Sequence, residues 1–250
     1  MSNHESLLDT VPGRLFIGDM RSSQDWGLPE NSIRAATRAI GRYLYSDGCQ
    51  EVAHFDPNDP ALRQFDAMGL AALARLSTFG SPQIHQGTIT ELHEPRIGNR
   101  DPLSALPNGA FWTSAPITDD EDSWTLCGEN LGREKPRWEV HFDVTHVRVA
   151  QIDSARDWCD LIDSNTAAGS GCRYPDWPAI GQSLHAVHLS PMGLLLAHPR
   201  ISTTPITDGS GQAHSEAGPY ASVAHWSTVS TAWLREPPNA ALRPAPVVAR

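Results

Sequence analysis

The segment from Trp138 to Asp153 constrains the fold most, because its side chains alternate between apolar and polar in two successive runs. The apolar members of the first run are Trp138, Val140, Phe142 and Val144. The second run continues through Val147 and Val149. Such alternation is typical of strands that bury one face. The segment therefore predicts two strands of a sheet.

The N-terminal third predicts helices after one short strand. We expect that strand at Arg14–Gly18, from its apolar run. Apolar residues at helical spacing predict a first helix that begins at Asn31 or Ser32 and extends to about residue 44. Asp59 and Pro60 predict the start of a second helix, which Gly80 to Pro82 would stop.

Short elements fill the rest of the chain. Helices are predicted from Ser154, which can cap its helix, and from Pro175 to about residue 184. Strands are predicted at residues 185–190, 192–198 and 230–235, and residues 199–222 predict a long surface loop.

Regular helices do not separate these strands, which argues against a doubly wound parallel sheet. We therefore expect one α+β domain over residues 1–236, with an N-terminal helical part packed on a mostly antiparallel sheet. The helical part would cover about 20–82 and the β-rich core about 83–236. Residues 237–250, rich in proline and alanine, predict a flexible tail.

Charge and cysteine content limit the functional classes. The formal net charge of −10 argues against general electrostatic binding of nucleic acid. None of the four cysteines belongs to a Cys-x-x-Cys pair, so a structural zinc site is not expected. The sequence starts without the pattern of a secretory signal, and no apolar run reaches membrane-spanning length, so we expect a cytoplasmic protein with no membrane partner.

The stretch from Gly109 to Pro116 carries the main candidate site. It predicts a strand on which Phe111 and Thr113 face one way while Trp112 and Ser114 face the other. Trp124 follows shortly after. Aromatic and hydroxyl groups in this arrangement suit a site that stacks a flat ring and hydrogen-bonds a sugar. A core strand with a capped end is the alternative interpretation.

Other catalytic patterns are weaker. His185 and His188 would point to opposite faces of a strand, which disfavours a shared metal. The nucleophile elbow of serine hydrolases, Gly-x-Ser-x-Gly, does not occur in the sequence. The acidic run Asp119–Asp122 predicts a solvated turn. Asp153 ends a predicted strand, where its carboxylate would project into a cleft or cap the following helix.

The order of these elements resembles the ADP-ribosyltransferase fold of bacterial NAD-using enzymes. Trp112-Thr113-Ser114 is similar to the Ser-Thr-Ser strand of that family, and Arg14 to the arginine of its first strand. Pro175-Asp176-Trp177 looks like a helix start seen in several relatives. The chain departs from the family where a catalytic glutamate is expected, because Gln151-Ile152-Asp153 carries aspartate there.

The resemblance implies a split β-sheet core and cleavage of the nicotinamide–ribose bond of NAD, by a mono-ADP-ribosyltransferase or an NAD glycohydrolase of the toxin type. Ser114, Asp153 and Glu216 would be catalytic. The residues implied to bind NAD are Arg14, Trp112, Thr113 and Trp124. Partners would be NAD as substrate, an acceptor (protein, nucleic acid or small molecule) and an antitoxin-type protein. Two alternatives are a catalytically silent module that binds a nucleotide or a protein, and an unrelated α+β hydrolase.

Overall fold

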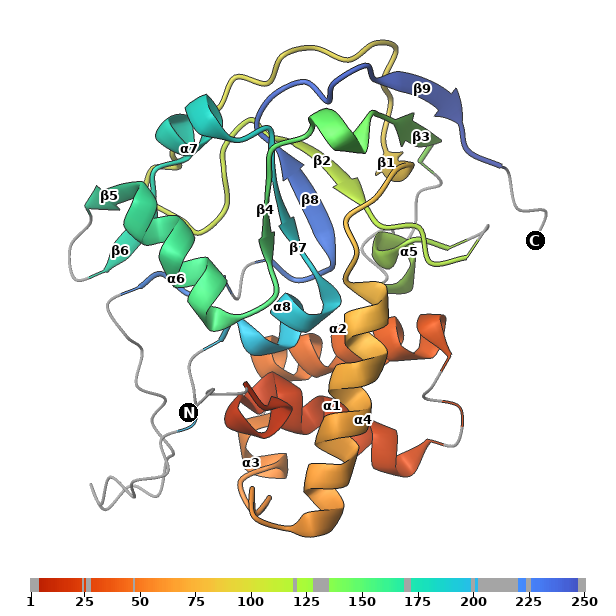
Figure 1. The fold of residues 1–250 in the computed structure, drawn as a ribbon, viewed down its shortest axis with the longest axis vertical. Coiled ribbons are helices and arrows are strands. Elements are labelled where there is room, and N and C mark those ends of the chain that lie inside the picture. Colours follow the sequence, from red (N-terminus) through yellow and green to blue (C-terminus); the bar gives the residue numbers. More distant parts are fainter. Residues whose placement is uncertain are drawn as a thin grey trace.

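The computed structural model describes residues 5–23, 25, 28–46, 48–118, 121–127, 135–168, 172–198, 201, 220–223 and 226–246. Its N-terminal helices form a layer below the sheet (Figure 1). After a 3₁₀ turn at Leu7–Asp9, these helices are α1 (Val11–Ser22), α2 (Pro29–Tyr45), α3 (Gly48–Glu51) and α4 (Pro60–Leu76). Within the described ranges, no helix is both long and apolar enough to cross a membrane.

Short strands and helices follow. The strands of the large sheet are β1 (Gln83–Gln86), β2 (Phe111–Ser114), β3 (Arg137–His141), β4 (Val149–Ile152), β7 (Ala186–Leu189), β8 (Ser230–Trp233) and β9 (Ala241–Pro244). The helices among them are α5 (Ser123–Cys127), α6 (Ala155–Ser164), α7 (Trp177–Ser183) and α8 (Pro191–Leu196). A 3₁₀ turn lies at Val144–His146, and a separate ribbon pairs β5 (Thr166–Ala168) with β6 (Arg173–Pro175).

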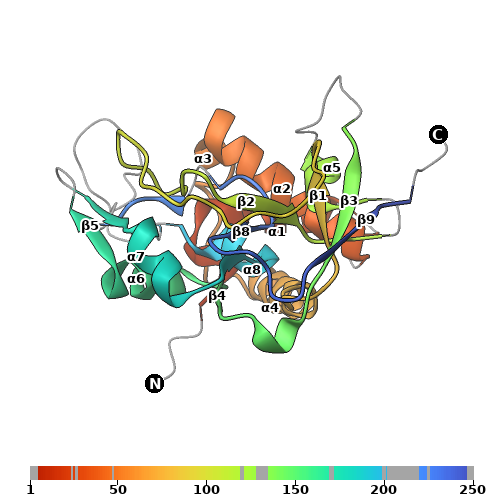
Figure 2. The same ribbon diagram turned by 90° about the horizontal axis from the view of Figure 1, so that it is seen from above.

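The large sheet has the strand order β4-β7-β8-β2-β1-β3-β9, and only β4 and β7 are parallel. The expected mixture of helices with a mostly antiparallel sheet is therefore confirmed. One register pair, Ile84 with Ser114, joins β1 to β2. The sheet thus consists of a four-stranded and a three-stranded part, and β1, β3 and β9 lie opposite α6 and α7 in Figure 2.

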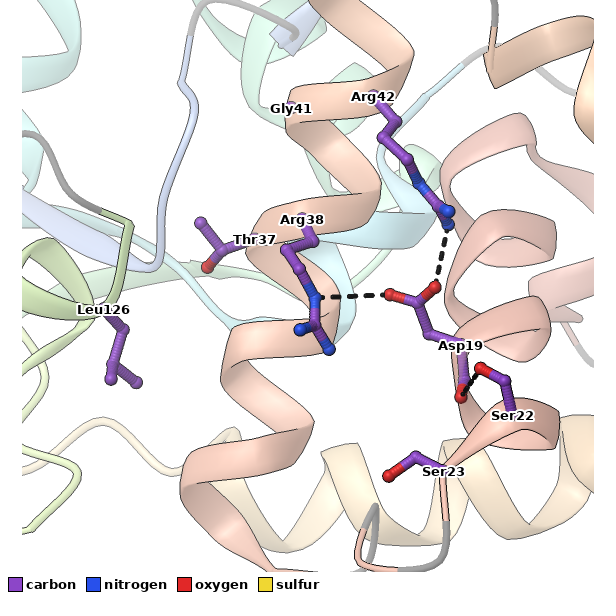
Figure 3. Close-up of a pocket in the computed structure, with 8 residues that line it drawn as sticks. All are labelled: Asp19, Ser22, Ser23, Thr37, Arg38, Gly41, Arg42 and Leu126. Carbon is purple, nitrogen blue, oxygen red and sulfur yellow. Dashed lines mark hydrogen bonds and ion pairs between the residues drawn. The ribbon is translucent and has the colours of Figure 1, made fainter.

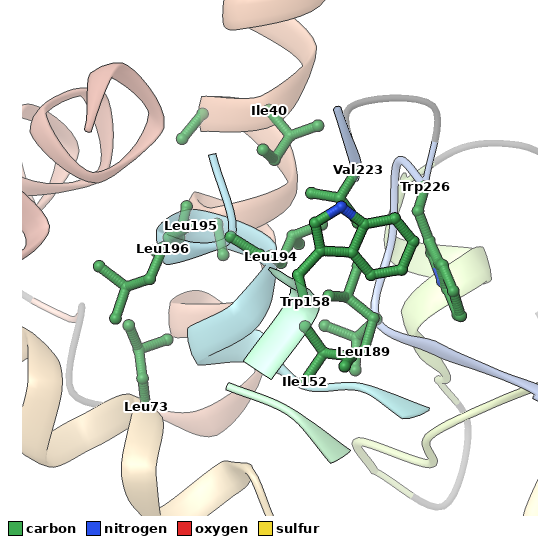
Figure 4. Close-up of a cluster of buried hydrophobic side chains, with 14 of the residues drawn as sticks. Ile40, Leu73, Ile152, Trp158, Leu189, Leu194, Leu195, Leu196, Val223 and Trp226 are labelled. Atoms are coloured by element: carbon green, nitrogen blue, oxygen red, sulfur yellow. The ribbon is translucent and has the colours of Figure 1, made fainter. Parts of the chain in front are cut away.

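The sheet has two unlike faces. The inner face, which carries Leu189 and Ile152, packs against α8 and the N-terminal helices. Figure 4 shows Leu196 of α8 beside Leu73 of α4, while Leu194 lies near Ile152 and Leu189. The outer face is covered by a smaller cluster that contains Phe79, Val140, Phe142, Ala186 and Trp233.

Two predicted strands are helices in the structure. Arg14–Gly18 lies within α1, where the side chain of Thr10 accepts a hydrogen bond from the Gly13 amide and Pro12 occupies the first turn. Residues 192–198 overlap α8, which Ser190 caps in the same way before Pro191. Both predictions are wrong because a short apolar run fits a buried helix as well as a strand, and the caps decide between them.

The predicted tail is wrong for residues 241–244, which form the edge strand β9 on β3. Pro244 is tolerated there because an edge strand leaves one side of its backbone unpaired. The predicted cap of α6 is confirmed, since the Ser154 hydroxyl accepts a hydrogen bond from the Asp157 amide. Most of the predicted loop at 199–222 lies outside the described residues.

Candidate functional site

The hydroxyls of β2 point to opposite faces of the sheet, as predicted, and both residues are fully buried. Thr113 lies on the outer face, where Trp233 donates its indole N–H to Thr113 Oγ1 at 2.9 Å. The Thr113 hydroxyl in turn donates to Gln83 Oε1. Ser114 lies on the inner face, 3.4 Å from the carbonyl of Ile84. The two hydroxyls therefore serve the packing of the sheet, as in the core-strand interpretation.

The two candidate stacking tryptophans belong to different elements. Trp112 is half-buried on the inner face, with its ring edge-on to Trp226 at a centroid distance of 5.1 Å. Trp124 belongs to the short helix α5, and its backbone N–H donates to Asp122 Oδ1 at 2.9 Å. Trp112 therefore lies on the sheet, whereas Trp124 lies on a helix that follows it.

Arg14 is a buried residue of the helical layer. Its guanidinium donates to the carbonyl oxygens of Leu8 at 2.7 Å, Phe55 at 3.2 Å and Val52 at 3.4 Å. Burial lowers the pKa of this guanidinium. Because the strand expected to carry Arg14 is a helix, the residue ties three carbonyls together and has no hydrogen bond to β2.

Asp153 lies between β4 and α6, at the opposite edge of the four-stranded part from β2. Its carboxylate accepts hydrogen bonds from Gln151 Nε2 at 2.8 and 3.1 Å, and its backbone N–H donates to Asp157. Glu216 lies outside the described residues. Among the predicted site residues that the structure describes, Trp112, Thr113 and Ser114 lie together on β2, whereas Arg14 lies in α1 and Asp153 follows β4.

A cavity of about 220 Å³ opens just beyond the end of β2, lined there by Ala115, Pro116 and Ile117. Its walls come from β1, β7, the start of β8 and the ends of α2, α4 and α8. The lining residues are Pro29, Ile33, Leu76, Thr78, Gly80, Ser81, Pro82, Gln83, Ala115, Pro116, Ile117, His188, Pro191 and Val229. We call this space the His188–Gln83 cavity, after its two buried polar residues.

Both polar residues of the cavity keep an unused nitrogen. His188 Nδ1 lies 2.9 Å from Thr231 Oγ1, while its Nε2 makes no hydrogen bond within the described part of the chain. Gln83 accepts from Thr113 through Oε1, and its side-chain N–H₂ has no acceptor among the described residues. Burial lowers the pKa of His188 to about 4, so the imidazole is neutral at pH 7.

A half-buried aromatic pair lies further along the same face. The His85 ring tilts onto Phe111 with a centroid distance of 4.7 Å. His85 Nδ1 lies 2.9 Å from the carbonyl of Trp112, which can only accept, so Nδ1 carries the proton and Nε2 presents a lone pair. His85 and Gln83 project from the same face of β1, two residues apart.

A second hollow, of about 700 Å³, lies between α1 and α2 beside Leu126 of α5 (Figure 3). It is a more open groove, because Arg38 on its wall is 65% exposed. Apolar walls with a few convergent polar groups and a shifted histidine are features of small-molecule sites. We therefore take the His188–Gln83 cavity as the candidate site.

Comparisons of the chain with protein-family models, with curated proteins and with solved structures give no significant match. No three His, Cys, Asp or Glu side chains within the described ranges lie close enough to hold a metal ion. Sequence reasoning considered His188 only as a metal ligand and overlooked Gln83. Strand alternation puts His188 on the face of Thr231, but only the strand order brings it to the cavity.

Proposed function

We propose that the chain binds NAD through its nicotinamide end, in the His188–Gln83 cavity, as a binding module of the ADP-ribosyltransferase-like kind. The carrying observation is the pair of unused nitrogens on Gln83 and His188 within a mainly apolar space, lined also by Thr78 and Ser81, next to the hydroxyl strand. The proposed kinship with ADP-ribosyltransferases rests on the sequence resemblance and on a sheet joined at one register pair.

Cavity size supports a ring rather than a whole dinucleotide. Sites for drug-sized ligands are roughly 300–1,000 Å³. At about 220 Å³, the cavity suits a single six-membered ring with a small substituent. Ribose and phosphates would remain outside.

A carboxamide complements the polar atoms. The Gln83 amide N–H₂ donates to the carboxamide oxygen, and the neutral His188 Nε2 pairs with the carboxamide N–H₂ as its acceptor. In that tautomer His188 Nδ1–H donates to Thr231 Oγ1. Buried polar atoms that gain partners in this way discriminate strongly against a ring that lacks the amide.

We favour binding over turnover because no carboxylate is found among the described residues that line the cavity. Cleavage of the nicotinamide–ribose bond develops positive charge on the ribose, which a nearby carboxylate would stabilise. Val229, the residue just before β8, lines the cavity with an apolar side chain.

Isothermal titration with nicotinamide tests the proposal. A ligand of this size is expected to bind with a Kd on the order of 1 mM. Benzamide, which keeps the carboxamide, should bind as nicotinamide does, whereas pyridine should not bind measurably. Ala115→Leu places a larger side chain in the cavity and should abolish the heat of nicotinamide binding.

A nicotinamide-release assay with NAD separates binding from catalysis. We expect no release above the buffer rate. Release that disappears in Glu216→Gln would establish an enzyme and refute the silent module. Equal titrations for wild type and Ala115→Leu, with circular dichroism showing both folded, would refute the cavity as the site.

A further inference from the structure

We propose a second, independent site: the groove between α1 and α2 binds a phosphate-type oxyanion. Its lining residues are Asp19, Ser22, Ser23, Thr37, Arg38, Gly41, Arg42 and Leu126. In Figure 3 the Asp19 carboxylate lies between the two arginines, and the Arg38 guanidinium projects toward the end of α1 that carries Ser22 and Ser23. We call this the arginine groove.

Two buried donors of the groove lack an acceptor. Thr37 Oγ1 and Arg42 Nε are both shielded from solvent and have no hydrogen-bond partner among the described residues. Buried polar groups in native proteins are almost always paired, so an unpaired group indicates a missing water or ion. In Figure 3 Thr37 points toward Leu126 and Arg42 toward Asp19, so the two unpaired donors face different sides of the groove, and each lacks an acceptor of its own.

Arg38 adds further free donors. Its only described ion pair is a contact of 3.5 Å from Nε to Asp19 Oδ2, which leaves both Nη groups without a partner in the described part of the chain. Arg42, by contrast, is fixed by hydrogen bonds to Asp19 at 3.0 Å and to the Leu15 carbonyl at 3.1 Å. The groove thus combines one rigid and one adjustable guanidinium.

The hydrogen-bond donors of the arginine groove indicate which kind of ligand it binds. Guanidinium and hydroxyl donors match an anion that presents several oxygens, although the Asp19 carboxylate competes with such an anion for the two arginines. A tetrahedral phosphate can bridge the Nη groups of Arg38 and the hydroxyl of Thr37. The volume of about 700 Å³ also accommodates the remainder of a small phosphate ester.

Titration with inorganic phosphate tests this site at constant ionic strength, with chloride as the competing anion. We expect saturable binding that Arg38→Gln weakens about tenfold, the loss typical of a hydrogen bond to a charged group. Arg75→Gln is the matched control, because Arg75 is exposed on α4 and its one hydrogen bond within the described ranges goes to Ala71 of its own helix. Parallel titrations with AMP and ribose 5-phosphate show whether the free anion or an ester is preferred.

Asp19→Asn should change the phosphate affinity in the opposite direction. The change removes the carboxylate that competes for both arginines, so phosphate should bind more tightly, by about threefold or more. The proposal is overturned if phosphate binding is unsaturable, or if Arg38→Gln and Arg75→Gln lower it equally. If the Asp19→Asn protein does not fold, the comparison of Arg38→Gln with Arg75→Gln decides the question.

Discussion

Thr113 and Thr37 place comparable hydroxyls in two differently built regions of the molecule. Thr113 lies in the sheet, where its hydroxyl is bonded to both Trp233 and Gln83. Thr37 lies in the arginine groove, where its Oγ1 is shielded and unpaired among the described residues. A polar group that is buried and satisfied stabilises the fold, whereas one that is buried and unsatisfied costs stability unless something binds it. The comparison separates residues that maintain the fold from residues available to a ligand.

The largest expected effect concerns Asp122, the most fully satisfied carboxylate in the described chain. Its oxygens accept from the side chains of Gln86, Thr125 and Arg137 and from the backbone of α5. Asp122→Ala leaves these donors without their acceptor, and we expect unfolding by urea to require about 3–5 kcal/mol less free energy. The control is Asp160→Ala, whose carboxylate is 66% exposed and makes a long contact to Arg156. Equal losses in the two variants would contradict the role assigned to Asp122.

Thr113→Val is the second test and addresses the comparison directly. The variant keeps the shape of the side chain but orphans the indole N–H of Trp233 and the Gln83 oxygen, both in the interior. We expect a loss of about 2–4 kcal/mol in the free energy of unfolding. A loss below about 0.5 kcal/mol would show that the hydroxyl network contributes nothing to stability.

The alternating pattern of β2 made its two faces predictable, because the face of each side chain depends only on neighbours in the sequence. Thr10 and Ser190 are residue types that favour helix caps, so α1 and α8 could also have been predicted from the sequence. The apolar runs that follow them led to a strand prediction instead. The candidate site was not predictable, since Gln83 and His188 meet only through the order β7-β8-β2-β1. That order is set by tertiary packing, which local propensity does not encode.

Two buried histidines, His188 and His198, should make the stability of the protein depend on pH. Burial lowers the pKa of His188 and His198 to about 4, below the ordinary value of 6.5. The unfolded state therefore binds protons first, and stability is full above pH 6.5 and declines as the pH falls toward 4. Each histidine should lower the free energy of unfolding by about 2 kcal/mol when the pH falls from 8 to 5.

His198→Gln isolates one of these contributions. The glutamine keeps a donor for the Leu194 carbonyl, which His198 Nε2 contacts at 3.0 Å, but it does not titrate. Urea unfolding at pH 8 and pH 5 should show a stability loss about 2 kcal/mol smaller than in the wild type. An unchanged pH dependence would mean that His198 is not buried as a neutral imidazole. Saturation of the His188–Gln83 cavity with nicotinamide should stabilise the protein equally at pH 8 and pH 5, because folded His188 is neutral at both values.

Thr37→Val carries the smallest expected effect on stability and completes the comparison with Thr113. The hydroxyl that it removes has no partner among the described residues, so no bond is broken and one desolvated donor disappears. We expect the free energy of unfolding to change by less than about 0.5 kcal/mol, or to rise slightly, in phosphate-free buffer. Phosphate should then stabilise the wild type more than the variant, because a ligand that binds only the folded state adds stability in proportion to its affinity. If Thr37→Val instead loses as much stability as Thr113→Val, the hydroxyl is already bonded in solution, and the distinction between the sheet and the groove fails.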